Sequence, residues 1–410
     1  MENKHQIVHE LYNVKLIIGN GFDLHCHLKT SYADYFLYDE TKNAELGEWI
    51  ENFHDKAIDY LKHTSNYNDS WVNLKNFDCF NVWDVLFYIV SSGNGEIVKW
   101  NWCNIEETIA ECLSGKSNNY RINRFNFEIV YEILNGNNNF NQMKIDENAY
   151  IIAGFIYKKN NEKQFNSKKD FYYFLLNQLN SFELNFGQYI YAQHCDDSHS
   201  VFSSTIYNDE FKRESLETLE ALCTLDNLTS VDTFNYDTPE CEKIEEIVHN
   251  INGNIKSPIF GIDSDSFLAP DPRHIFTKTS RRLEFEMKHK EIEPLFNYEN
   301  VIIFGCSLNK ADYNYFFSIF DKLNITSENN DSKIVFAYSV YDNNKRKNIC
   351  TALKENVFLL FQEYSKYIGI STYPTRLLEL LMIQRKIIFF EIPFYNTTEP
   401  TYFKKSITSK

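Results

Sequence analysis

The sequence is poor in the residues that interrupt regular structure. Its 410 residues include 13 glycines and 8 prolines, which excludes a collagen-like chain and argues against low-complexity disorder. Hydrophobic residues make up 43% of the chain and aromatic residues 16%, so there is enough apolar mass for more than one core. At this length we expect two or three domains.

The sequence also lacks the marks of secretion and of membrane insertion. Its start, Met-Glu-Asn-Lys-His, has no charged segment followed by an apolar one, as a signal peptide would. No apolar run approaches the ~20 residues that cross a bilayer. The nine cysteines include no CxxC pair and their number is odd, which favours reduced thiols over a disulfide framework or a zinc ribbon. These features predict a cytoplasmic protein with no membrane partner.

Positive charge is in short supply. Lysine and arginine number 41 against 57 aspartates and glutamates, a formal net charge of −16. A chain this acidic has no overall attraction for nucleic acid, so we do not expect a nucleic-acid partner. The basic clusters at Arg281-Arg282 and Lys345-Arg346-Lys347 are interpreted as solvated surface.

Short apolar runs bounded by turn residues indicate buried parallel strands. Helix-like sequence separates them, and this alternation is typical of an α/β fold. It predicts a Rossmann-like parallel sheet whose ligand site lies at the carboxyl ends of the strands. The expected strands are Val14–Ile18, Leu228–Phe234, Asn300–Phe304, Ser332–Tyr338 and, near the C-terminus, Lys386–Ile392.

The long stretch between the first two expected strands has helical periodicity. Ser167 and Asp170 are spaced as a helix cap, and apolar residues follow at intervals of three and four. We therefore expect a large helical insertion at 41–224 within a core made of 1–40 and 225–345, followed by a C-terminal helix and strand extension at 346–410. The apolar face consists of Phe171, Leu175, Leu179, Phe182, Phe186 and Ile190.

A glycine turn follows the first expected strand. Gly19 and Gly21 flank Asn20, and the segment continues with Phe22 and Asp23. Such glycines allow a tight turn that would bring backbone N–H groups close to a phosphate or a ribose. An ordinary strand-to-helix turn explains the same residues, and the third glycine of the dinucleotide fingerprint is missing.

Three more polar turns lie at later strand ends, and each also has a plain turn interpretation. Asn235 could hydrogen-bond a ribose or position a water, while Asp237 could carry charge or cap the next helix. The remaining two turns contain Asn252-Gly253 and Gly305-Cys306-Ser307, the latter followed by Asp312. Four such turns at one edge of a sheet favour a binding site over four unrelated turns.

These segments together resemble a known family. KLIIGNGFDLHCHLKTSYADYF is similar to the signature of the AbiH family of phage abortive-infection proteins, and VDTFNYDTPE, INGNIKSPIFGID and IFGCSLNKAD follow in the family's order. The resemblance covers residues 13–320. It implies bacterial defence in which the infected cell is arrested or killed, with an unknown phage-derived trigger. Assembly into a homo-oligomer is left open.

The four motifs are also similar in layout to those of the sirtuin NAD-binding fold. This resemblance implies NAD or a related nucleotide as ligand, no metal, and an NAD(P) glycohydrolase type of reaction. It implies that Asn235 and Asp237 orient a water and the ribose. The implied nucleotide-binding residues are Gly19, Asn20, Gly21, Phe22, Asp23, Asn252, Gly253, Gly305, Ser307 and Asp312.

One position departs from the sirtuin pattern. Asn252 stands where a histidine is expected, and a neutral amide cannot take a proton as an imidazole can. His249, three residues upstream, is a candidate replacement for the missing base, although a surface histidine is the commoner case. The sequence thus leaves open both an enzyme and an inactive module that senses a nucleotide or a phage protein. A metal cluster around His194 and His199 is not expected, because its ligands are adjacent in sequence.

Overall fold

The structure is a computed structural model with well-defined helices and strands. It describes residues 2–38, 40–54, 56–61, 77–91, 102–115, 126–136, 147–194, 209–239, 241–289, 297–370 and 375–394. Within these ranges, no helix has both the length and the apolar character that a membrane-crossing segment requires.

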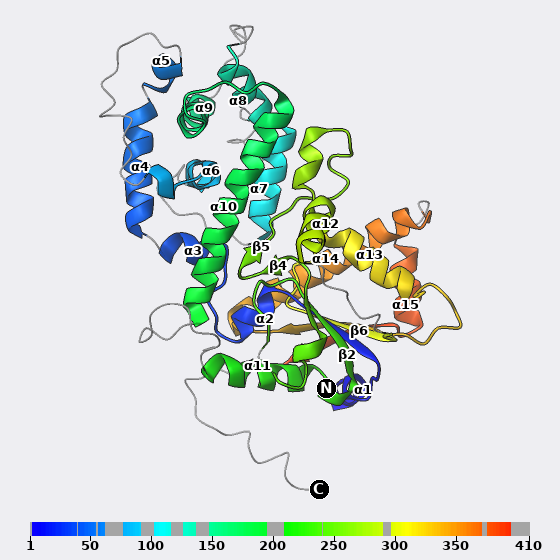
Figure 1. Cartoon of the computed structure of the whole chain (residues 1–410). Coiled ribbons are helices and arrows are strands. Elements are labelled where there is room, and N and C mark those ends of the chain that lie inside the picture. Colours follow the sequence, from blue (N-terminus) through cyan, green and yellow to red (C-terminus); the bar gives the residue numbers. More distant parts are fainter. Residues whose placement is uncertain are drawn as a thin grey trace.

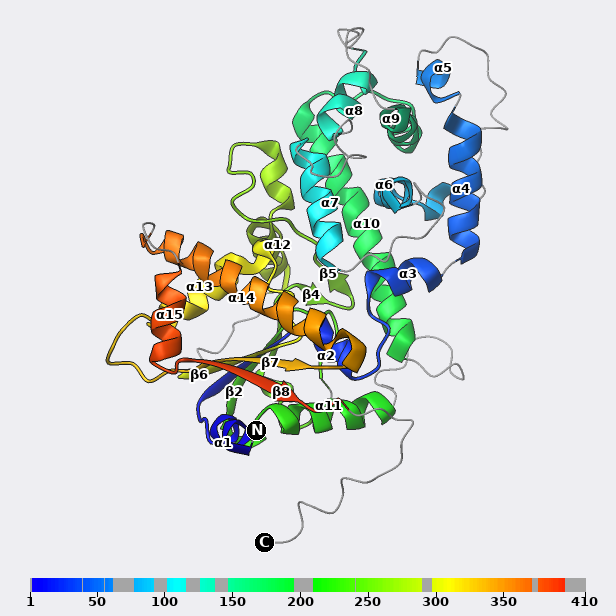
Figure 2. The ribbon, with the colours of Figure 1, turned by 180° about the vertical axis from the view of Figure 1, so that it is seen from behind.

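A six-stranded, fully parallel sheet forms the centre of the fold (Figures 1 and 2). Its order is β3-β2-β1-β6-β7-β8. The five expected strands are all present, with ends shifted by at most two residues. The three-residue β3 was not expected, because it is too short to give an apolar run. The strands are β1 Val14–Ile18, β2 Leu228–Thr233, β3 Val248–Asn250, β6 Asn300–Phe304, β7 Ile334–Ser339 and β8 Ile387–Ile392.

Both faces of the sheet are buried, which explains why its central strands are continuous apolar runs. Successive side chains of a strand point to opposite faces. Accordingly, Leu16 and Ile18 of β1 join the hydrophobic cluster on one face, and Ile17 joins the cluster on the other. All three side chains are fully buried.

Different helices cover the two faces (Figures 1 and 2). Helices that precede β2 in the chain pack on the face of Leu16, and helices that follow β6 pack on the face of Ile17. The sheet is therefore the middle of three layers. The first set is α1 Glu2–His9, α2 Asn20–His25 and α11 Asp209–Leu222; the second is α13 Tyr313–Lys322, α14 Arg346–Tyr367 and α15 Arg376–Ile383.

A helical region with its own aromatic core stands beside the sheet (Figure 1). The chain enters it after α2 and returns to the sheet at β2. The predicted apolar face of residues 171–190 is buried along α10, and Ser167 Oγ accepts the N–H of Asp170 at 3.1 Å at its start. The helices are α3 Tyr32–Tyr38, α4 Glu40–His54, α5 Ala57–Leu61, α6 Val82–Ser91, α7 Trp102–Ser114, α8 Phe127–Leu134, α9 Glu147–Lys159 and α10 Lys168–His194.

The segment between β3 and β6 connects the sheet to this helical region. It contains a small hairpin, β4 Gly253–Asn254 and β5 Ser257–Pro258, and the helix α12 Lys278–His289. Glu183 of α10 accepts Arg281 Nη2 at 2.7 Å and the N–H of Phe260 at 2.6 Å. This buried ion pair fixes α12 against α10.

The Glu183–Arg281 pair predicts a pH-dependent effect of mutation. Burial raises the pKa of Glu183 to about 7, although Arg281 opposes the rise. The folded pKa of Glu183 exceeds its ordinary value of 4.5, so protonation of this carboxyl group stabilises the folded state. The stabilisation is fully present below pH 4.5 and is lost as the pH rises through 7. Arg281→Met should cost about 3–5 kcal/mol at pH 8, where it leaves a buried charge unpaired, and clearly less at pH 5.

Urea unfolding followed by tryptophan fluorescence measures the loss of stability at each pH, since Trp49 and Trp83 are buried in the aromatic core of the helical region. The control is Lys243→Met, which breaks an exposed pair with Asp226 and should change stability by less than ~1 kcal/mol. An equal loss at both pH values for Arg281→Met would show that the charge of Glu183 does not matter.

Candidate functional site

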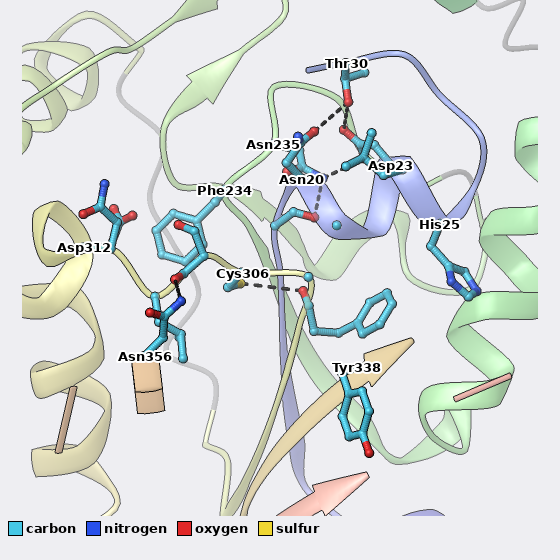
Figure 3. Close-up of a pocket in the computed structure, with 18 of the residues that line it drawn as sticks. Asn20, Asp23, His25, Thr30, Phe234, Asn235, Cys306, Asp312, Tyr338 and Asn356 are labelled. Carbon is cyan, nitrogen blue, oxygen red and sulfur yellow. Dashed lines mark hydrogen bonds between the residues drawn. The ribbon is translucent and has the colours of Figure 1, made fainter. Parts of the chain in front are cut away.

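The polar turns meet where the sheet reverses its winding. The helix after β1 packs on one face of the sheet and the helix after β6 on the other, so the chain leaves these neighbouring strands toward opposite faces. Ligands of open α/β sheets bind in the crevice at such a point, beyond the carboxyl ends of the strands. A cavity of about 720 Å³ lies there (Figure 3).

Backbone contact between two glycine turns forms the floor of the cavity. Gly19 and Gly21 donate their N–H groups to the carbonyl oxygens of Phe304 and Gly305, at 3.0 and 2.9 Å. A Cβ on Gly21 would lie 2.5 Å from Gly305 Cα. The glycines are thus needed for the two loops to touch. Their N–H groups are bonded within the protein, so these two amides do not serve as the expected phosphate donors.

A network of buried polar side chains lines one end of the cavity (Figure 3). Asn235 Nδ2 donates to Asp23 Oδ1 at 2.7 Å and to the Gly19 carbonyl at 3.1 Å. Thr30 Oγ1 lies 2.7 Å from Asn20 Oδ1 and 3.1 Å from Asp23 Oδ2. The network joins the loop after β2 to the α2 segment and holds the Asp23 carboxyl group at the cavity wall.

Behind Asp23 lies a second carboxyl group. Asp23 and Asp237 are each 3% exposed. His194 Nε2, at the end of α10, lies 3.0 Å from Asp237 Oδ2. Burial, and then the charge of Asp237, raise the pKa of Asp23 well above its ordinary value, against the hydrogen bonds from Thr30 and Asn235.

The opposite wall carries a charged cluster between the helical region and the sheet. Lys278 Nζ lies 3.0 Å from Glu106 Oε2 and 2.6 Å from Asp312 Oδ1. Burial disfavours the charge on Lys278, but Asp312 and Glu106 outweigh it and raise its pKa. Burial also raises the pKa of Glu106, against the attraction of Lys278. Asn252 accepts Arg282 Nη2 at 2.9 Å and donates to the Phe234 carbonyl at 3.3 Å.

The far end of the cavity is aromatic and aliphatic. Tyr338, Tyr341 and Phe394 line it, together with Leu24 and neighbouring apolar residues of α14. His25 lies there too, with its ring centroid 5.3 Å from that of Phe394. Burial, and then His27, lower the pKa of His25 to about 4, so the imidazole is neutral at physiological pH. This end therefore presents aromatic rings and aliphatic side chains to a ligand, rather than charged groups.

Most of the residues predicted from the sequence are brought together at the cavity, but four are not. Asp237 lies behind Asp23, and Phe22 packs into the sheet core beneath the turn. Gly253 belongs to the β4–β5 hairpin, and His249 lies on β3, opposite Asp232 in the sheet register. The predicted residues that line the cavity are Gly19, Asn20, Gly21, Asp23, Asn235, Asn252, Gly305, Ser307 and Asp312.

Several residues of the site were missed by sequence reasoning. Lys278 and Glu106 belong to segments without a turn motif, and only the folded chain brings them together. His194 was considered only as a metal ligand, whereas the structure pairs it with Asp237. Thr30 gave a weak signal, since it follows Asp23 by seven residues in the same motif. In the described ranges, no group of His, Cys, Asp and Glu side chains has an arrangement that could hold a metal ion; residues 195–199 lie outside them.

Comparison with known proteins identifies the family. The sequence model described as "Bacteriophage abortive infection AbiH" matches residues 16–338, more than three-quarters of the chain. The chain belongs to the AbiH family. Membership implies a role in phage defence by abortive infection, and the matched region includes every residue of the glycine turns and the polar network. No curated protein and no solved structure matches the chain significantly.

The contact between the AbiH protein's glycine turns makes a prediction about stability. Gly305 has φ +69°, and a Cβ there would lie 2.5 Å from the backbone nitrogen of Phe22. Gly369 has φ +83° with no atom within 4 Å of the same position. Gly369→Ala should therefore cost only backbone strain, about 1–2 kcal/mol, while Gly305→Ala should cost about 1–3 kcal/mol more because the loops must separate.

Urea or thermal unfolding of the two variants measures this difference directly. Equal losses would mean that the turns tolerate separation and that the glycine is needed only for its backbone angle.

Proposed function

We propose that this AbiH protein binds a nucleotide of the NAD class in the cavity and hydrolyses it when phage infection triggers the protein. The single observation that carries the proposal is the cavity itself: a hydrogen-bonding end and an aromatic end within about 720 Å³, at the carboxyl edge of a parallel sheet. Ligand cavities of roughly 300–1,000 Å³ suit small molecules and cofactors.

We propose further that the sheet is a Rossmann-like core. Counted along the chain within the sheet, its strands follow the order 3-2-1-4-5-6, the order of doubly wound dinucleotide-binding folds. The distant resemblance to sirtuins fits the same proposal, although it rests on the sequence motifs alone.

The chemistry of the two ends favours a nucleotide with few phosphates. Asp23, Asn235 and Thr30 present the acceptors and donors that ribose hydroxyls need, and Tyr338 and Tyr341 offer rings for a base to stack on. Among the described residues lining the cavity, Lys278 is the only lysine or arginine, and Glu106 and Asp312 hold it. This arrangement is unsuited to a triphosphate and compatible with a dinucleotide whose sugars are the recognised parts.

A second function, binding without turnover, is favoured by a specific observation. Asn252, in the position of the expected histidine, is bonded to Arg282 and to the Phe234 carbonyl, and His249 does not line the cavity. An imidazole base is therefore absent from that part of the described cavity wall. An AbiH protein that senses a nucleotide through the same pocket would need no such base.

Purified protein incubated with NAD distinguishes these functions. We expect NAD to raise the melting temperature, and nicotinamide to be released when lysate from phage-infected cells is added. Asn235→Ala should weaken binding by at least about tenfold, because it removes the amide that holds Asp23.

Asn52→Ala is the matched control, since Asn52 is exposed on α4 and bonds only the Glu48 carbonyl there. It should behave as the wild type. NAD binding without nicotinamide release under any condition would favour the sensor, and the absence of binding would overturn both functions.

A further inference from the structure

The charged wall of the cavity contains a residue from outside the sheet and its turns. Glu106 belongs to α7 of the helical region, yet its side chain lines the cavity beside that of Lys278. The side chain of Glu106 is 12% exposed and that of Lys278 is 3% exposed, so both charged groups lie largely out of water. Buried charges require partners, and the pairing decides what net charge the wall presents to a ligand.

The backbone fixes the positions of Lys278 and Glu106. The N–H of Lys278 donates to the carbonyl oxygen of Ile262 at 2.9 Å. A Cβ on Gly261 would lie 2.7 Å from Lys278 Cγ, so glycine at this position leaves room for the lysine side chain. The N–H of Gly261 donates to Glu106 Oε1 at 3.3 Å. Both members of the ion pair are thus anchored to the same short segment of chain.

The charges of this cluster cancel. Lys278 Nζ lies between Glu106 and Asp312, at 3.0 and 2.6 Å, and Arg282 Nη2 lies 3.4 Å from Asp312 Oδ1. Two cations therefore face two carboxylates. Lys278 lines the cavity and Arg282 does not, so Lys278 is the cation that a ligand meets in the described part of the wall. With Glu106 in place, this wall has no surplus positive charge for a phosphate.

We propose that Glu106 is a specificity-determining residue: it neutralises Lys278 and so limits the phosphate charge that the cavity accepts, which selects NAD over NADP. This inference rests on the proposed function and narrows its substrate class. NADP differs from NAD by one phosphate on the adenosine ribose, which adds about 1.5 to 2 negative charges at neutral pH. That phosphate would enter a cavity in which Asp312 lies across from Asp23 (Figure 3).

Removal of the Glu106 charge should reverse the selection. Glutamine has the shape of glutamate, and its oxygen can still accept the N–H of Gly261. Glu106→Gln leaves the cluster with one surplus positive charge, carried by Lys278 at the cavity wall. A charge in a mostly buried wall attracts a phosphate more strongly than one in water. The diphosphate is common to NAD and NADP, so its own attraction to Lys278 cancels from the ratio of the two affinities.

Titration calorimetry of the full chain with NAD and with NADP, in the absence of infected lysate, measures this ratio. The wild type should bind NAD at least about tenfold more tightly than NADP. Glu106→Gln should reduce that preference by at least about tenfold, through tighter binding of NADP. Adding Lys278→Met to Glu106→Gln should restore the preference, because it removes the surplus charge.

Glu107→Gln is the matched control. Glu107 is the next residue of α7, is exposed and does not line the cavity. The substitution removes the same charge from the same helix and should leave the wild-type preference unchanged. If Glu106 had only a structural role, its substitution would weaken the binding of both dinucleotides together and leave their ratio as it is.

Asp312→Asn removes the other carboxylate of Lys278 and provides the test if Glu106→Gln fails to fold. It should shift the ratio toward NADP in the same direction. Equal affinity of the wild type for NAD and NADP, or an unchanged ratio in the folded variants, would overturn the role of Glu106 and leave the proposed function standing. The absence of binding of either dinucleotide to the wild type would overturn the proposed function as well.

Discussion

The site depends on one contact, the touching of the turns that follow β1 and β6. Gly21 and Gly305 meet at backbone distance, and the amides of the first turn are bonded to the carbonyls of the second. This contact fixes the start of α2, and with it the direction of Asp23. Asn235 then ties Asp23 to the loop after β2. Three adjacent strands of the sheet thus position one carboxyl group.

Burial then raises the pKa of the Asp23 carboxyl group. Neutral groups, the Asn235 amide and the Thr30 hydroxyl, offset part of the cost of removing the Asp23 carboxyl group from water, and no lysine or arginine of the described residues forms an ion pair with it. The helical region takes part through His194 and Glu106, each of which reaches the sheet from a helix end or side. A change in the packing of that region would therefore disturb the contacts that His194 makes with Asp237 and Glu106 with Lys278.

Much of the fold could be predicted from the sequence because its strands are buried on both faces. A run such as Asn300–Phe304 is typical of such a strand, and Gly305 marks where it ends. The residue pairs that complete the site could not be predicted. Asp237 with His194, and Lys278 with Glu106, are brought together only by packing between distant segments. The glycine turn itself was predicted correctly, but the expected role of its N–H groups was wrong. Gly19 and Gly21 donate to carbonyl oxygens at the end of β6 and in the turn after it, so these two N–H groups are not available to a phosphate.

The most direct test of the central claim is a crystal structure of this AbiH protein grown with NAD. The geometry predicts density for the nicotinamide ribose against Asp23 and Asn235, and for the adenine near Tyr338 and Tyr341. An empty cavity at saturating NAD, or a dinucleotide bound elsewhere on the molecule, would contradict it.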